Sequence, residues 1–151
     1  MNALSRTGVS SLAGGCGHFG RCQVLISAWA YKKIWRRSGE VFETCSISMP
    51  DVEMQTFAAW ADVSGPLKAR LDAEGLDVLA GCHGASHAVV NVLPQFLLGF
   101  DPAAVGTECP SPAQVRSRPM RFIFYDAVPG GTGIAAAAFA RFPEIVRAAH
   151  D

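Results

Sequence analysis

The sequence predicts an α+β (mixed α/β) domain in which a small, mostly antiparallel sheet packs on a central buried helix and is completed by a C-terminal helix. Three observations support this prediction. β-Branched and aromatic residues fill much of residues 24–63, apolar residues recur at helical spacing in 67–98 and 134–149, and an almost wholly apolar run occupies 121–125. At 151 residues, the chain can bury about two-thirds of its unfolded surface.

The domain organisation follows from composition. Residues 1–17 are rich in Gly and Ser without periodicity, so we expect a flexible N-terminal segment there and a single domain over residues 18–151. The five cysteines are odd in number and irregularly spaced, and no secretory signal or membrane-length apolar run is present. These features predict a cytoplasmic protein with reduced thiols and no membrane partner.

The first half is expected to form three strands in a meander, over residues 24–31, 41–48 and 54–63, with helix as the rival interpretation for the last. Ser38 and Gly39 supply the first turn, and Pro50 with Asp51 interrupts the chain before the third strand.

The second half is expected to be mainly helical. A short helix from Leu67 ends at Gly75, and the main helix runs from Asp77 to Leu98, with Pro94 kinking it or ending it early. An irregular loop follows over residues 99–120, with a disordered middle at 111–117. The strand 121–125 then leads to a closing helix over 134–149, in which Pro143 starts a separate final turn.

Charge is unevenly distributed although the formal net charge is zero. Residues 1–37 carry six basic and no acidic groups, 38–110 carry two basic and ten acidic, and 111–151 carry five basic and three acidic. One short run mixes cations with aromatic rings, the combination that binds single-stranded nucleic acid by charge and stacking. It contains Tyr31, Lys32, Lys33, Trp35, Arg36 and Arg37.

Strand alternation, if it continues through this run, places Lys33, Trp35 and Arg37 on one face. The alternative is a solvated strand edge whose Lys and Arg side chains prevent aggregation.

His83, His87 and Asn91 lie at helical spacing and form a polar seam on an apolar helix. Two imidazoles four residues apart can share a metal ion, and Asp101, Glu108, Cys109 and Asp126 are the candidates for further ligands. The alternative, which we favour, is that the seam hydrogen-bonds to the backbone of the kinked helix and its loop. A second thiol and imidazole cluster, Cys16, His18 and Cys22, has the wrong spacing for a metal knuckle and resembles a disordered terminus.

The turn from Pro129 to Gly133 opens a helix, where free backbone N–H groups are able to hold a phosphate. The favoured alternative is structural, because glycine permits positive φ and close packing. No Walker A motif and no activated nucleophile occur, since Ser86 and His87 are helix neighbours that do not face each other. We therefore expect no catalytic residue and no enzymatic activity.

The order of these motifs resembles the MrfA-like zinc-binding (MZB) domain at the C-terminus of superfamily-2 DEAD/DEAH-type DNA helicases, formerly a domain of unknown function. The resemblance extends over about residues 18–150 and includes the run from Tyr31 and the strand that ends near Trp60. Its most specific part joins the histidine helix to the glycine turn, through His83, His87, Asn91, Tyr125, Asp126, Pro129, Gly130, Gly131 and Gly133.

The resemblance implies a non-catalytic helicase-associated domain that contributes to DNA repair by binding a helicase motor and single-stranded DNA. A related domain in a non-motor subunit of the DISARM phage-defence system extends the expectation to phage defence. The family holds a structural zinc through four cysteines near the domain end, but the cysteines here do not match that cluster, so we expect no cofactor. The rival function is a small metal-dependent enzyme centred on His83 and His87.

Overall fold

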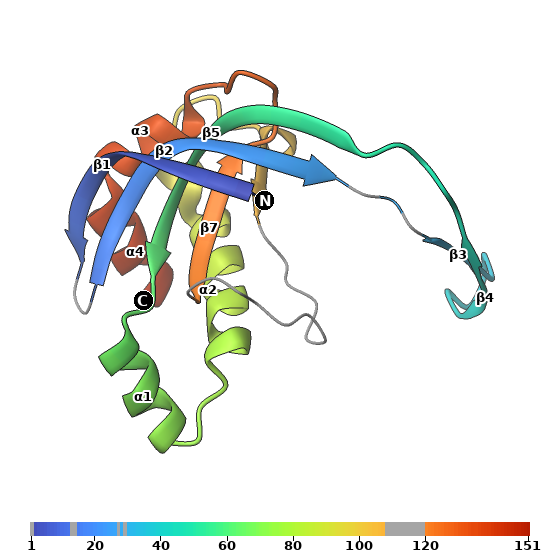
Figure 1. Cartoon of the computed structure of the whole chain (residues 1–151), viewed down its shortest axis with the longest axis horizontal. Helices are drawn as coiled ribbons and strands as arrows, with labels where there is room; N and C mark the ends of the chain where they lie inside the picture. Colours follow the sequence, from blue (N-terminus) through green and yellow to red (C-terminus); the bar gives the residue numbers. More distant parts are fainter. Residues whose placement is uncertain (1, 13–14, 27, 29, 108–119) are drawn as a thin grey trace.

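A computed structural model describes residues 2–12, 15–26, 28, 30–107 and 120–151, and the side chains of this set from residue 17 onward. Figure 1 shows a curved sheet backed by helices, with a long β-ribbon projecting to one side. The strands are β1 (Asn2–Leu12), β2 (Gly15–Ile26), β3 (Ala30–Ile34), β4 (Val41–Ser46), β5 (Val52–Asp62), β6 (Val105–Thr107) and β7 (Arg121–Asp126). The helices are α1 (Gly65–Ala73), α2 (Val78–Val92), α3 (Ile134–Ala140) and α4 (Phe142–His150), with the 3-10 turns η1 (Leu93–Gln95) and η2 (Pro102–Ala104).

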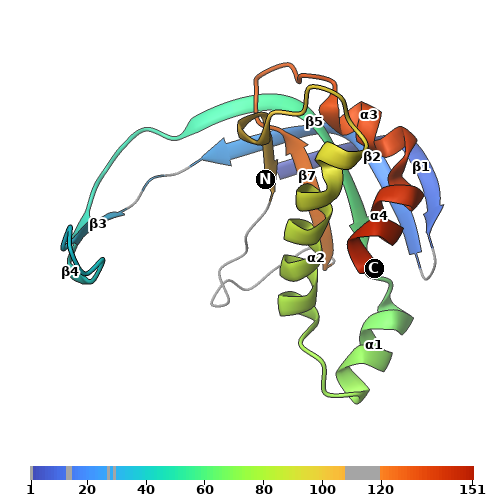
Figure 2. The ribbon, with the colours of Figure 1, turned by 180° about the vertical axis from the view of Figure 1, so that it is seen from behind.

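The body of the molecule is one five-stranded sheet in the order β1-β2-β5-β7-β6, in which every neighbouring pair is antiparallel. Helices α2, α3 and α4 lie together on one face of this sheet (Figure 2). The predicted α+β class is confirmed. Among the described residues, no helix combines the length and apolar character that a membrane crossing needs.

Strand β5 contributes to two hydrophobic clusters because its side chains alternate between the two faces of the sheet. Ala59 and Ala61 pack in the cluster that contains Phe124 and Phe142, on the helical face. Ala58 and Trp60 belong to a second cluster with Cys22, Val24 and Ile123. Small residues on β5 let the helices approach the sheet closely.

The three-strand meander predicted for residues 24–63 is wrong. Strand β2 pairs directly with β5, from Gly17 opposite Ala61 to Ile26 opposite Val52, and the segment between them forms the separate β3–β4 hairpin. Pro50 and Asp51 interrupt the ladder without reversing the chain. The described residues between 25 and 53, called the arm below, therefore project from the sheet as a β-ribbon (Figure 1).

The flexible segment expected at residues 1–17 also differs from the structure. Residues 2–12 form β1, and β2 begins at Gly15, so the two strands pair along their length with two register shifts. Backbone hydrogen bonds between paired strands do not require apolar side chains, which is why a Gly- and Ser-rich composition did not reveal this hairpin. The boundary between residues 17 and 18 stays a prediction.

Helix α2 is shorter than predicted. Asp77 caps it by accepting hydrogen bonds from the backbone of Leu79 and Ala80, and the helix ends at Val92, where Pro94 forces the 3-10 turn η1. The predicted closing helix is divided at Arg141 into α3 and α4. The loop expected over 99–120 contains η2 and strand β6, while its predicted disordered middle lies outside the described residues.

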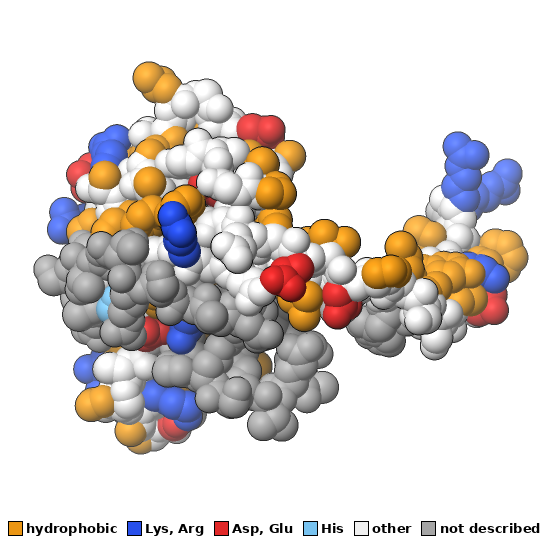
Figure 3. All heavy atoms as spheres, turned by 45° about the horizontal axis from the view of Figure 1, so that its top comes forward, with side chains coloured by type: hydrophobic (Ala, Val, Ile, Leu, Met, Phe, Trp, Pro, Cys, Tyr) orange, Lys and Arg blue, Asp and Glu red, His pale blue; other side chains and the backbone are white. Residues whose placement is uncertain are grey.

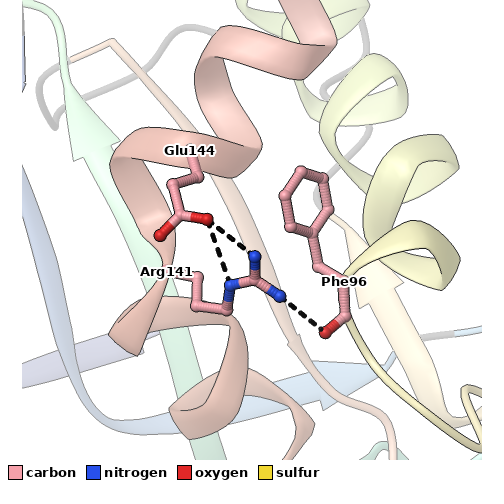
Figure 4. Close-up of polar contacts among 3 residues, drawn as sticks. All are labelled: Phe96, Arg141 and Glu144. Atoms are coloured by element: carbon pink, nitrogen blue, oxygen red, sulfur yellow. Dashed lines mark hydrogen bonds and ion pairs between the residues drawn. The ribbon is translucent and has the colours of Figure 1, made fainter.

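Arg141 joins the helix break to the end of α2. Its guanidinium donates to the Phe96 carbonyl over 3.3 Å and to Glu144 over 2.7 Å, as Figure 4 shows. The same guanidinium lies 4.8 Å from the centre of the Phe96 ring. The contact satisfies a carbonyl beyond η1 and fixes α4 against the end of α2.

Candidate nucleic-acid interface

The tip of the arm, residues 30–46, holds all six residues predicted to bind nucleic acid. Strands β3 and β4 form its ladder, and a tight turn closes it through backbone hydrogen bonds between Trp35 and Glu40 and between Gly39 and Trp35. The Trp35 ring packs against Phe42 with ring centres 4.6 Å apart, yet these side chains are 58% and 50% exposed. Flat aromatic surface is therefore presented to solvent at the far end of the molecule.

Cationic side chains surround these rings. Lys32, Arg36 and Arg37 are exposed, and Lys33 forms a 2.6 Å ion pair with Glu43 on the neighbouring strand. The space-filling view shows Lys and Arg side chains gathered at the end of the arm (Figure 3). Sequence order alone brings these groups together, because they occupy one strand and the turn that follows it.

The predicted common face for Lys33, Trp35 and Arg37 is wrong for Arg37. Strand β3 ends at Ile34, and residues 36–38 form the turn, so alternation does not extend to this position. Phe42, the partner of Trp35 across the hairpin, is not among the six residues predicted to bind nucleic acid. The signal was its place in a strand that faces the basic run.

Tyr31 lies on β3 directly opposite Cys45 on β4. Hydrogen bonding to Cys45 is the main cause that raises the pKa of the Tyr31 phenol. An uncharged phenol, the state of any ordinary Tyr at neutral pH, adds a ring and a hydrogen-bonding group to the tip without adding repulsion toward phosphate.

The histidine seam lies on the solvent side of α2. His83, His87 and Asn91 are exposed, and the two imidazole rings meet edge to face with centres 4.6 Å apart. The buried side of the helix is formed instead by Val78, Cys82, Ser86 and Val89, so α2 is buried along one face rather than all round. Because the seam reaches water, solvent can hydrogen-bond to its polar groups, and the predicted bonds to the backbone of the kinked helix and loop stay a prediction.

The glycine turn is filled by the side chain of Asp126. This carboxylate, fully buried at the end of β7, accepts hydrogen bonds from the backbone N–H groups of Thr132, Gly133 and Ala135 at 2.8–3.0 Å. Gly131 has φ +86°, and a Cβ there would stand 2.9 Å from the carboxylate. The amides considered for phosphate binding at the start of α3 already hold an internal anion.

Neighbouring motif residues pack around the same turn. Gly106 on β6 lies against the Tyr125 ring, which a Cβ would approach to 2.4 Å, and Thr56 donates to the Asp126 carbonyl over 2.8 Å. Gly130 donates its backbone N–H to the Gln55 carbonyl on β5. These contacts fasten the turn to the central strands.

The remaining metal candidates do not assemble into a site within the described part of the chain. Asp101 caps η2 through Ala103, and Asp126 is occupied as above, while Glu108 and Cys109 lie outside the described residues. No group of three or more His, Cys, Asp and Glu side chains that could hold an ion occurs among the residues described. These residues do not fit the zinc centre that the resemblance implies.

Two members of the predicted cluster of Cys16, His18 and Cys22 are buried in the body, namely His18 and Cys22. His18 is buried, with its ring 5.5 Å from that of Trp60 and its Nε2 3.7 Å from Asp62, which also pairs with Arg121 at 3.0 Å. Burial, followed by the nearby charge of Asp126, raises the pKa of the Cys22 thiol to about 11. The Cys16 side chain lies outside the described set.

Fold and tip together define a small α+β domain with a projecting aromatic and basic arm and no nucleotide-binding motif. The family model of the MrfA Zn-binding domain matches residues 85–151, which include the second half of α2, β7 and the glycine turn. The resemblance predicted from the sequence is confirmed.

Two curated relatives are helicases. The chain is 29% identical over 141 residues to the ATP-dependent helicase HRQ1 of Saccharomyces cerevisiae and 25% identical over 140 residues to the ATP-dependent helicase hrq1 of Schizosaccharomyces pombe. Each match covers 85% of this chain and 13% of the relative, so the chain spans about an eighth of their length.

A solved structure has the same fold. The crystal structure of the DUF1998 helicase MrfA bound to DNA superimposes with a TM-score of 0.66 and 23% identity, over 94% of this chain and 18% of that one. The chain therefore has the architecture of a segment of that helicase, and its similarity to helicases supports an accessory role in a helicase.

Proposed function

We propose that this chain is a non-catalytic, helicase-associated domain that contributes to DNA processing, in repair or phage defence, by binding a helicase motor and single-stranded DNA. The observation that carries the proposal is the tip of the arm, where exposed Trp35 and Phe42 rings stand among Lys32, Arg36 and Arg37. The ATP-driven step belongs to the motor, in the same polypeptide or in a partner.

Single-stranded DNA matches both properties of the tip. Its bases have unpaired faces that stack on aromatic rings whatever the sequence, and its phosphates attract Lys and Arg side chains. A duplex hides its base faces, so it would use only the charges. The tip therefore favours single strands over duplex.

The test is fluorescence anisotropy with a labelled oligothymidine, titrated at several salt concentrations. Trp35→Ala should weaken binding by a factor of roughly 5 to 150, since stacking contributes about 1–3 kcal/mol per base. The double change Arg36→Gln, Arg37→Gln should lower the slope of log affinity against log salt by about 1.4, because each phosphate contact contributes about 0.7.

The matched control is Lys68→Gln, Arg70→Gln on α1, which removes the same charge from a helix of the body. This variant should bind the oligonucleotide as the unchanged protein does. Equal weakening by the two double variants would show that binding follows overall charge, and the tip would lose its role.

A further inference from the structure

The arm carries an apolar surface between its tip and the body. Ile26 and Val52 lie opposite each other in the ladder and are 52% and 60% exposed, and Met49 and Leu25 are exposed as well. We call residues 25, 26, 28 and 47–53 the shaft. Of the twelve exposed large hydrophobic side chains among the described residues, nine belong to the arm.

The shaft surface continues a buried face of the body. Val24 and Met54, two residues inward from Ile26 and Val52 and therefore on the same face, belong to the second hydrophobic cluster with Trp60. Val24 is 4% exposed, whereas Ile26 is 52% exposed. One apolar stripe thus runs from the interior of the body out onto an uncovered ribbon.

A two-stranded ribbon offers nothing of its own to cover such a stripe. Its strands have no third layer, and an isolated hairpin is only marginally stable in water. A partner that covers Ile26 and Val52 removes apolar surface from water and holds the ribbon in one orientation. The stripe therefore has the properties of a docking surface.

Charge identifies the kind of partner. The shaft contains no Lys or Arg, and two acidic residues, Asp51 and Glu53, adjoin Val52 in the sequence. Glu53 lies on the opposite face of the ribbon from Val52, where it is paired with Leu25 and hydrogen-bonded to Gln23. Figure 3 shows acidic and apolar side chains where the arm leaves the body, away from the basic tip. The acidic face repels phosphate, so the shaft suits a protein surface that is apolar where it meets Ile26 and Val52 and carries Lys or Arg toward the acidic face.

We propose that the shaft docks onto such a surface of the helicase motor while the tip stays free for DNA. The inference rests on the proposed function, and it assigns the motor contact to residues that the DNA contact does not use. The match covers only 13% of the ATP-dependent helicase HRQ1, so most of that relative lies outside the domain and includes the parts that could meet the shaft.

The test places the photo-crosslinking residue p-benzoyl-phenylalanine at Val52 in the cells that naturally make the protein, and identifies the crosslinked peptides by mass spectrometry. The expected adduct joins Val52 to a helicase motor sequence, in the same chain or in a partner. The same residue at Lys68 on α1 is the matched control and should give no motor adduct. Crosslinking at Val52 to a second copy, to DNA, to an unrelated protein or to nothing would overturn the proposal.

Charge reversal supplies a second measurement. The variant Asp51→Lys, Glu53→Lys should lower the Val52 adduct yield on the order of tenfold or more, since like charges would then meet across the contact. Its oligothymidine affinity should not fall, because the tip is unchanged. An unaltered adduct yield would refute the charge-matched docking, whereas loss of DNA binding in the tip variants alone would refute the proposed DNA contact and leave the docking intact.

Discussion

The body and the arm use the same residue types in opposite ways. Trp60, in the centre of the sheet, is 1% exposed, whereas Trp35 at the tip is 58% exposed. Trp60 lies on β5 at the body end of the ribbon, and Trp35 directly follows β3 at its tip. An aromatic residue in this ribbon therefore stabilises the fold at one end and is available for binding at the other.

This comparison explains an unusual composition. Half of the residues are hydrophobic and 17% are charged, more apolar than an average soluble domain. Much of the surplus lies on the arm, where Ile34, Val41 and Phe42 are about half exposed. The excess reflects surface available to partners rather than a larger core.

Truncation of each tryptophan should give the largest difference in stability between the body and the arm. Trp60→Ala should reduce the free energy of unfolding by about 3–5 kcal/mol because it leaves a cavity in a packed cluster. Trp35→Ala should reduce it by less than about 1 kcal/mol, since the ring loses only its contact with Phe42. Urea unfolding followed by circular dichroism measures both, and similar losses would show that the arm is part of the core.

Two aspartates test the same difference between buried and exposed side chains within the body. Asp126→Ala should lower the free energy of unfolding by about 3 kcal/mol, because it leaves buried N–H groups of the glycine turn without an acceptor. Asp77→Ala removes an exposed cap of α2 and should cost about 1 kcal/mol. Equal losses in urea unfolding would contradict the internal anchoring role of Asp126.

The body and the arm also differ in the reactivity of their thiols. The pKa of Cys22 is about 11 in the folded protein against 9.0 when unperturbed, so the fold favours the neutral thiol. This contribution to stability is complete below pH 9 and is lost as the pH rises toward 11, by up to about 2 kcal/mol. Urea unfolding at pH 8 and 10.5 should therefore show a steeper decline for the unchanged protein than for Cys22→Ala.

Thiol labelling at pH 8 gives an independent readout. Cys45 on the arm is partly exposed and should react first, whereas buried Cys22 should be protected until the body opens. Rapid labelling of Cys22, read peptide by peptide in a mass spectrometer, would be incompatible with its burial.

The smallest expected effect concerns the contact at the helix break. Arg141→Ala should lower the free energy of unfolding by about 1 kcal/mol, because it removes a hydrogen bond and a cation–ring contact that are both partly exposed. Arg141→Lys should recover only part of this loss, since an ammonium group lacks the planar fork that reaches both Phe96 and Glu144. Full recovery in thermal unfolding would mean that charge alone is sufficient.

Local signals predicted the helices, the strand at β7 and the composition of the tip. Pro94 and Pro143 interrupt a helix whatever residues surround them, because proline lacks a backbone N–H. The basic and aromatic run could be predicted because its residues are contiguous in the chain. The role of Asp126 was hidden because its three donors lie six to nine residues further on, and only the folded turn brings them to the carboxylate.

The arm is the largest feature of the fold that the sequence did not predict. Residues near Pro50 have no signal that distinguishes a chain reversal from an interruption in a ribbon, because proline is compatible with both. Pairing between β2 and β5 joins Ile26 to Val52 across a long separation in sequence, and tertiary context decides it. Pairing between β1 and β2 likewise depends on tertiary context, so the Gly- and Ser-rich sequence of residues 1–17 predicts a flexible segment instead.

The arm is not a hairpin added at an edge of the sheet. The β3–β4 hairpin at its tip follows β2 and precedes β5 in the chain, and β2 and β5 each have hydrogen-bonded neighbours on both sides. A mechanical load applied at the tip therefore enters the sheet through its interior strands, where no outer strand can peel away first.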